Sequence, residues 1–288
     1  MDKKHDKMML DLHRIIDAQN FSSEKEKEKF LKSLIGKKIP SLPKLALTPV
    51  QQAQDLVYEA YELPPPNAKA YIEKALALDP DCIDAYEFLG NTAPTMKFAM
   101  TNFEKGIAIG RRIFGGDYLE ENIGSFWRIV ETRSFMRCLQ AFSDCLIEQG
   151  KVKDAVAILE EMIVLNPNDN QGVRDQLKLF LIYLNEDEKY LKYNEMFKDD
   201  IFAYALFNEA LFAFKTEGET ENSNQKLFKA LNQNKFVAPK LLSKKPIFLE
   251  TSTFSMGDEN EANYYASFAQ KVWTRINGAT WWLKKHAF

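Results

Sequence analysis

The stretch that decides the fold is residues 126–174, which read FWRIVETRSFMRCLQAFSDCLIEQGKVKDAVAILEEMIVLNPNDNQGVR. Two apolar, helix-favouring segments are separated at Gly150, where a residue that readily takes a positive φ can end the first helix. Ala155 is small enough to let the two helices approach closely, and Pro167 cannot continue a helix and so ends the second. Counted from Met136, these residues predict a helix-turn-helix unit of about 34 residues.

The same pattern recurs earlier in the chain. Aligning Pro80 with Pro167 places Ala68 opposite Ala155, so a second unit has its small residue at the same place in the second helix. Residues 117–125 are expected to be an irregular connector, and Asn168 or Asp169 is expected to cap the helix that follows the turn at residues 166–170. Apolar spacing and turn residues predict helices near residues 50–63, 68–78, 83–90, 98–114, 126–149, 174–185, 190–196, 202–214, 223–231 and 257–273.

The regions outside these repeats divide the chain into three parts. Residues 1–48 are expected to be an N-terminal extension of two helices followed by a proline-containing connector from Gly36 to Pro49. Residues 49–235 hold the helical repeats. Residues 236–288 are rich in aromatic side chains, and we expect them to cover the open end of the repeat array as a C-terminal cap.

Composition narrows the classes of protein considered. With 288 residues, of which 45% are hydrophobic, the chain can bury a sizeable core. The formal net charge of −3 exerts no overall attraction on nucleic acid or on an anionic membrane. We find no apolar run near the roughly 20 residues that span a bilayer and no secretory signal, so we expect a cytoplasmic protein. Cys82, Cys138 and Cys145 are expected to be buried, reduced thiols.

The sequence favours a protein that is not an enzyme. All three histidines, His5, His13 and His286, lie near the ends of the chain, which leaves no central histidine for acid-base chemistry or metal binding. We find no glycine-rich phosphate loop and no His-Glu-x-x-His motif. We therefore predict no catalytic residues, no cofactor and no metal site.

The candidate binding residues lie in two rows. In the helix of residues 126–149, Arg133, Arg137 and Gln140 are three or four residues apart and share one face with Asp144. The next first helix has polar residues at matching offsets. If the first helices of successive units line one groove, both rows face it; the second row consists of Gln171, Arg174 and Lys178.

Two interpretations of these rows remain open. Arg137 and Arg174, side by side, could grip a carboxylate of a peptide C-terminus or an acidic side chain through bidentate hydrogen bonds. Alternatively, carboxylates of the same chain neutralise the arginines. The candidates for that role are Glu131, Asp144, Asp169 and Asp175.

Gly150, Ala155 and Pro167, with their counterparts Ala68 and Pro80, make the chain resemble tetratricopeptide repeat (TPR) proteins. The segment from Glu131 to Arg137, followed by that from Leu165 to Arg174, is similar to a segment of bacterial repeat proteins of undefined role and of the suppressor of tumorigenicity 7 family. Ser134 stands where those proteins have a proline. The resemblance implies an all-α, right-handed solenoid of antiparallel helix pairs that acts through protein contacts.

On this basis we expect a scaffold or adaptor that binds a peptide or helix of a protein partner in a concave groove. Two alternatives remain. The groove could recognise a small anionic ligand in a regulatory protein, or the array could be a structural unit of a homo-oligomer.

Overall fold

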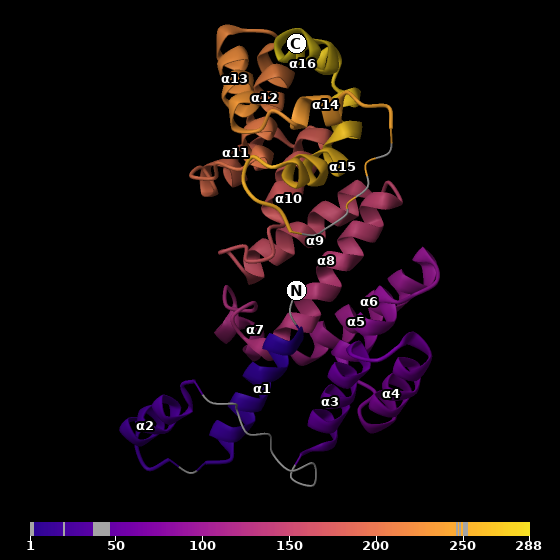
Figure 1. The fold of residues 1–288 in the computed structure, drawn as a ribbon, viewed down its shortest axis with the longest axis vertical. Helices are drawn as coiled ribbons and strands as arrows, with labels where there is room; N and C mark the ends of the chain where they lie inside the picture. Colours follow the sequence, from indigo (N-terminus) through magenta and orange to yellow (C-terminus); the bar gives the residue numbers. More distant parts are fainter. Residues whose placement is uncertain (1–2, 20, 37–46, 246, 248, 250–252) are drawn as a thin grey trace. The chain divides into compact units, whose positions relative to one another are not determined.

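A computed structural model describes residues 3–19, 21–36, 47–245, 247, 249 and 253–288, and over these residues the chain is helical throughout, without strands (Figure 1). The expected all-α fold is confirmed. The helices are α1 (Lys3–Asp17), α2 (Glu24–Leu34), α3 (Pro49–Tyr61), α4 (Pro65–Leu78), α5 (Ile83–Asn91), α6 (Met96–Ile113), α7 (Asp117–Asn122), the 3-10 helix η2 (Val130–Thr132), α8 (Arg133–Glu148), α9 (Val152–Leu165), α10 (Arg174–Leu184), α11 (Asp187–Met196), α12 (Ala203–Glu217), α13 (Glu221–Gln233), α14 (Val237–Leu241), α15 (Glu259–Arg275) and α16 (Ala279–Ala287).

The turn chemistry behaves as the sequence predicts. Gly150 follows α8 with φ of 75°, and the N–H of Lys151 donates to the carbonyl of Leu146, the bond that closes a helix end of this type. Ala155 on α9 is fully buried. Ser23 caps α2, where its side chain accepts from the N–H of Glu26.

The expected helix over residues 126–149 begins seven residues later than predicted, at Arg133. Before it, the Thr132 hydroxyl donates to the carbonyl oxygens of Phe126 and Ile129. The Phe126 N–H donates to the Leu165 carbonyl oxygen 3.1 Å away. The burial of Phe126 and these hydrogen bonds therefore hold residues 126–129 in a turn before the 3-10 helix η2, and this tertiary contact overrides the helical pattern.

Three local predictions are wrong. Residues 117–125 are not wholly irregular, because α7 occupies the first six of them. The helix predicted near residues 68–78 begins three residues earlier, because Pro65 is the first residue of α4, where its missing N–H costs nothing. Neither Asn168 nor Asp169 caps α10, whose cap position is Val173 without a side-chain hydrogen bond.

The contacts group the chain into two compact units. Unit 1 consists of residues 1–151 and 161–170, and unit 2 of residues 152–160 and 171–288. The three-part division at residues 48 and 235 stays a prediction, and most of the connector expected from Gly36 to Pro49 lies outside the described residues.

Unit 1 is built from helix pairs with one further helix laid on them. Helices α3 and α4 pack together, as do α5 and α6, and α8 packs on both members of the second pair. Helix α5 contacts α3 on one side and α8 on the other, so the first helices α3, α5 and α8 are neighbours in that order. Helix α1 contacts α3 and η2. We call the surface of α3, α5, η2 and α8 that receives α1 the α1 face.

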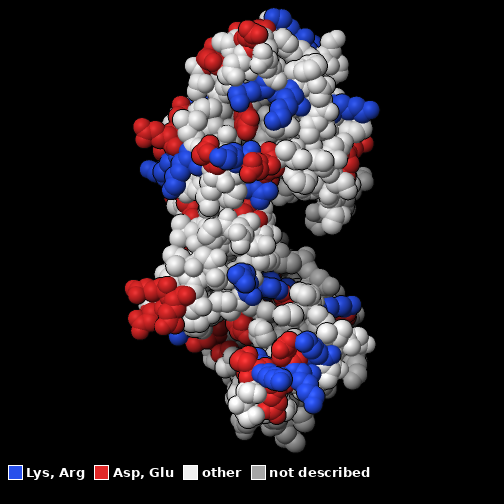
Figure 2. Space-filling model, turned by 90° about the vertical axis from the view of Figure 1, so that its left-hand side faces the viewer, with Lys and Arg blue, Asp and Glu red and all other residues white. Residues whose placement is uncertain are grey.

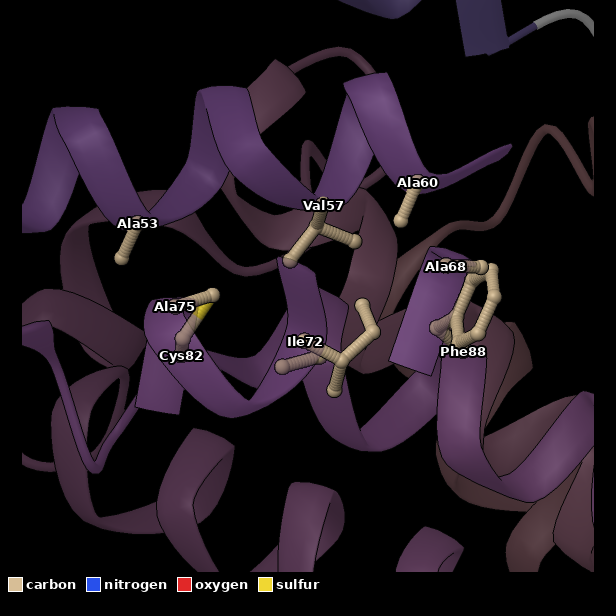
Figure 3. Close-up of a cluster of buried hydrophobic side chains, with 9 residues drawn as sticks. Ala53, Val57, Ala60, Ala68, Ile72, Ala75, Cys82 and Phe88 are labelled. Atoms are coloured by element: carbon tan, nitrogen blue, oxygen red, sulfur yellow. The ribbon is translucent and has the colours of Figure 1, made fainter. Parts of the chain in front are cut away.

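The core of the first pair consists of small and branched side chains (Figure 3). Ala53, Val57 and Ala60 on α3 point toward Ala68 and Ile72 on α4. All five are at most 1% exposed. Alanines at the contact let the two helix axes come close, so the small residue predicted at position 68 acts as the repeat pattern requires.

Glycines set the spacing between the next helices of unit 1. A Cβ built on Gly90 of α5 would lie 2.2 Å from Phe103 Cε1 of α6, and one on Gly110 of α6 would lie 2.2 Å from Phe135 Cδ2 of α8. Both distances are far below van der Waals contact, so α5, α6 and α8 pack this closely only with glycine at these positions.

Unit 2 contains two further pairs, α10 with α11 and α12 with α13, followed by the C-terminal helices. Helix α15 packs against the first helices α10 and α12, and α16 packs against α12, α13, α14 and α15. Trp273 and Trp282 are fully buried with their rings nearly parallel and 6.3 Å apart. These tail aromatics therefore build a core within unit 2.

The remaining expectations from composition can now be compared with the structure. Cys82, Cys138 and Cys145 are buried and free, as predicted. Burial raises the pKa of the Cys145 thiol to about 11, which keeps it protonated. Among the described helices, none combines the length and apolar character needed to span a membrane. Figure 2 shows both basic and acidic side chains on the face it presents, with one group of acidic side chains at the left-hand edge.

Candidate functional site

Two of the arginines predicted to bind a carboxylate, Arg133 and Arg137, do bind one, and it is the Asp6 side chain on α1 of the same chain. Arg133 Nη1 donates to Asp6 Oδ1 at 2.6 Å, and Arg137 Nη1 donates to Asp6 Oδ2 at 2.7 Å. The Asp6 side chain is 3% exposed and that of Arg137 10%. One carboxylate therefore bridges two guanidinium groups one helical turn apart on α8, at the place where α1 lies on the first helices.

A second carboxylate completes the pairing of Arg137. Arg137 Nε lies 2.9 Å from both carboxylate oxygens of Glu87 on α5, and Arg137 Nη2 lies 3.7 Å from Asp84 Oδ1. Lys3 on α1 donates to the same carboxylate, with Nζ 2.7 Å from Glu87 Oε2. Three cations, Lys3, Arg133 and Arg137, and three carboxylates, Asp6, Asp84 and Glu87, share this network, so their charges balance.

The other end of α1 is held on α3. Arg14 is 6% exposed, and its Nη1 donates to Asp55 Oδ1 at 2.7 Å. Its Nη2 donates to Gln54 Oε1 at 3.1 Å and to the Gln51 carbonyl at 3.3 Å. Between the two charged ends, Leu10 packs with Tyr58 of α3 and Val130 of η2.

The pairing of Asp6 with Arg137 and Arg133 lowers the pKa of Asp6. Burial by itself would raise the pKa of Asp6, but the charges and hydrogen bonds of Arg137 and Arg133 outweigh burial and bring the pKa below its ordinary value of 3.8. For Arg137, burial acts to lower the pKa, and the carboxylates Glu87, Asp84 and Asp6 reverse this and raise it. Both groups are therefore charged at neutral pH.

The alternative of internal neutralisation is thus observed for Arg133 and Arg137, with carboxylates other than those expected. Asp6 and Glu87 fill that role, while Glu131 faces His13, with Oε1 3.4 Å from Nδ1. The sequence does contain a signal on α1 itself: Lys3, Asp6, Leu10 and Arg14 recur at helical spacing, so they form one line along the helix, although this pattern does not name the arginines as the partners of Asp6.

The second predicted row lies on α10 and just before it, in unit 2. Arg174 Nε donates to Asp200 Oδ2 at 2.8 Å, and its guanidinium lies 5.5 Å from the centroid of the Phe197 ring. Gln171 is half-buried, as is Gln140 on α8 of unit 1. A clamp formed jointly by Arg137 and Arg174 stays a prediction.

Lys178 does not present its amine to solvent. Its side chain is fully buried, and Nζ has no hydrogen-bond partner among the described residues. Burial lowers the pKa of Lys178; Asp175 and Asp200 oppose this shift and Arg174 adds to it. The expected position of Lys178 as a lining residue of a groove is therefore not what this structure shows.

A pocket of about 290 Å³ beside α1 is lined by residues that include His13, Arg14, Asp81 and Asp84. Among the described residues, no group of three or more His, Cys, Asp or Glu side chains is arranged to hold a metal ion.

Comparison with known proteins adds one structural likeness. Neither a protein-family model nor a curated protein matches this chain, so the resemblance to the suppressor of tumorigenicity 7 family rests on the quoted residues alone. A solved structure described as "Crystal structure of YrrB: a TPR protein with an unusual peptide-binding site" is similar at 22% identity and a TM-score of 0.45. The likeness covers 70% of this chain and 91% of that one.

Proposed function

We propose that this protein is a non-enzymatic interaction scaffold that binds a peptide or helix of a protein partner on the α1 face of unit 1. The observation that carries the proposal is the Asp6 carboxylate held between Arg133 and Arg137. Two arginines that converge on one carboxylate of a separate helix form a geometry that recognises acidic side chains.

The manner in which α1 is held supports this function. Helix α1 lies against α3, α5 and α8 and is held by contacts of its own side chains. An amphipathic helix binds in a groove in the same way, through side chains that recur about one turn apart. A surface that receives one helix through charges and a few apolar side chains can receive another helix of similar pattern.

The test is a selection of displayed helical peptides on the immobilised full chain and on the paired variant Arg133→Gln with Arg137→Gln. We expect the natural chain to enrich peptides that carry an acidic residue, and these peptides to lose at least tenfold in affinity on the paired variant. Arg111→Gln is the matched control, because Arg111 forms an exposed ion pair with Glu161 on another surface of unit 1. Circular dichroism verifies that each variant is folded.

Two results would overturn the scaffold proposal. One is the absence of any enriched peptide, and the other is enrichment of peptides that bind the paired variant equally well. Saturable binding of acetate or phosphate without peptide binding would favour the small-anion alternative. A stable oligomer in light scattering, again without peptide binding, would favour a structural unit of a homo-oligomer.

A further inference from the structure

The α1 helix carries a four-residue stripe whose chemistry matches the surface beneath it. Lys3, Asp6, Leu10 and Arg14 are three, four and four residues apart, so they follow one line along the helix. The order is basic, acidic, apolar, basic. We call these residues the α1 stripe.

Each position of the stripe meets a complementary group of unit 1. Lys3 pairs with Glu87 at 2.7 Å, and Arg14 pairs with Asp55 at 2.7 Å. Asp6 pairs with the two arginines of α8, and Leu10 enters the apolar contact with Tyr58 and Val130. The surface thus offers four successive binding positions for the stripe: an acidic one, a basic one, an apolar one and a second acidic one.

Helix α15 provides a comparison within this chain, because it also lies on first helices. It lies on the first helices α10 and α12 of unit 2, and it buries seven residues of mainly apolar character. They are Glu261, Ala262, Tyr265, Ala266, Ala269, Val272 and Trp273. Its contact is therefore dominated by apolar burial.

Helix α1 is held differently. Its buried residues are Asp6, Leu10, Arg14 and Ile15, of which two are charged. Met8, on the same helix, is 43% exposed. Ion pairs specify which helix is bound but contribute little net stability after desolvation, whereas apolar area contributes most of it. The contact of α1 is accordingly selective and comparatively weak.

The chain also keeps α1 close to its binding surface. Residues 18–48 join α1 to α3, so α1 binds as a tethered ligand at high effective concentration. A free partner must compete with this tethered helix, and the affinity measured for the partner is lowered accordingly.

We infer that α1 is an exchangeable occupant of the α1 face, and that the partner is a helix bearing the same stripe, basic, acidic, apolar and basic at i, i+3, i+7 and i+11. This inference rests on the proposed scaffold function and specifies its partner and its regulation. Partner binding requires α1 to leave, so the N-terminal helix restrains binding until a helix that pairs more strongly displaces it.

The experiment uses the full chain with Asp6→Lys and a fluorescent peptide of residues 3–17. A lysine in front of Arg133 and Arg137 repels them, so α1 should vacate the face and leave it open to the added peptide. We expect the peptide to bind the Asp6→Lys chain at least tenfold more tightly than the natural chain by fluorescence anisotropy, and to bind more weakly as the salt concentration rises.

Two controls isolate the stripe. Asp17→Lys makes the same change in charge at an exposed position of α1, and this chain should bind the peptide no better than the natural chain does. A peptide that itself carries Asp6→Lys should not bind the Asp6→Lys chain, because its lysine would again face the two arginines.

Hydrogen exchange on the natural chain provides a second measurement if Asp6→Lys fails to fold. Amides of α1 should exchange at least tenfold faster than those of α15, because α1 detaches without global unfolding. Equal protection of the α1 and α15 amides from exchange would overturn the inference. A folded Asp6→Lys chain that binds the peptide no more tightly than the natural chain would also overturn it. The scaffold proposal would survive either result if displayed peptides still depended on Arg133 and Arg137.

Discussion

Arg137 is the residue on which the buried network of unit 1 depends most. It contacts carboxylates from two helices, Asp6 on α1 and Glu87 on α5, and both are 3% exposed. A buried ion pair adds little when complete, but removing one partner leaves an uncompensated charge in a medium that solvates it poorly.

The first prediction concerns Arg137→Ala. We expect it to lower the free energy of unfolding by about 3 kcal/mol, because Glu87 and Asp6 lose their shared partner. Urea denaturation measures this loss. Arg111→Ala removes a pair in which the arginine side chain is 54% exposed, and it should cost at most about 1 kcal/mol. Equal losses for the two variants would contradict the assigned role of Arg137.

Lys178 gives the second prediction at this scale. Its buried amine has no hydrogen-bond partner among the described residues. Methionine has a side chain of similar volume but no charge, so Lys178→Met removes a desolvated charge without leaving a cavity. We expect it to stabilise the protein by about 1 kcal/mol at neutral pH. Lys229→Met, at an exposed site on α13, should change stability by less than about 0.5 kcal/mol.

The pH dependence of that stabilisation has a definite sign. The pKa of Lys178 in the folded chain is lowered below 10.5, so the folded protein releases this proton before the unfolded chain does. The burial penalty is complete below the folded pKa and shrinks as the pH rises toward 10.5. The advantage of Lys178→Met should therefore decrease with rising pH, and an advantage that grows would show that Lys178 is stabilised by charge.

At the scale of elements, α1 is distinguished from the other helices by how it is held. Burial of Leu10 and Ile15 contributes about 1.5–3 kcal/mol for each side chain, and fixing the helix on the α1 face consumes conformational entropy that offsets much of this. The charge pairs then decide whether α1 stays docked.

The third prediction uses this dependence on charge. Because the pKa of Asp6 lies below 3.8 in the folded chain, ionised Asp6 stabilises the protein above that pH, and the stabilisation is lost as the pH falls through the folded pKa. Asp6→Asn should therefore be destabilising near neutral pH, with a difference from the natural chain that shrinks in acid. Urea denaturation at several values of pH measures both curves.

The control for this prediction lies on the same helix. Asp17→Asn changes an exposed carboxylate of α1 and should stay within about 0.5 kcal/mol of the natural chain across that range. A difference for Asp6→Asn that does not change with pH would show that shape, rather than charge, holds α1.

At the scale of the whole molecule, the charges give no field of one sign. The chain has 38 basic and 41 acidic residues, and the face shown in Figure 2 carries side chains of both signs. Nucleic-acid binding depends on clustered cations that displace counterions from phosphates, and in unit 1 several cations are already paired with carboxylates.

The fourth prediction follows from this distribution. Fluorescence anisotropy with a labelled duplex and a labelled single strand should show no saturable binding at about 150 mM salt and protein concentrations of about 10 μM. Saturable binding that weakens steeply with added salt would overturn the prediction and would point to a basic surface that the charge balance conceals.

The sequence by itself determined the helices of this protein and the chemistry of most of its turns. Gly150, Ala155 and Pro167 act through their own backbone preferences and side-chain size, which are local properties, so their spacing predicts the pair of helices around them. The late start of α8 escaped prediction because Phe126 is held by Leu165, a residue far along the chain.

Only the tertiary structure decided what Arg133 and Arg137 bind. Their partner Asp6 is 127 and 131 residues away, and no local pattern on α8 refers to it. Which helix occupies the α1 face depends on which surfaces remain after the pairs have packed and on whether their charges match in space. Periodicity along one segment does not contain that information, because it records which face of a helix is polar and not what that face will meet.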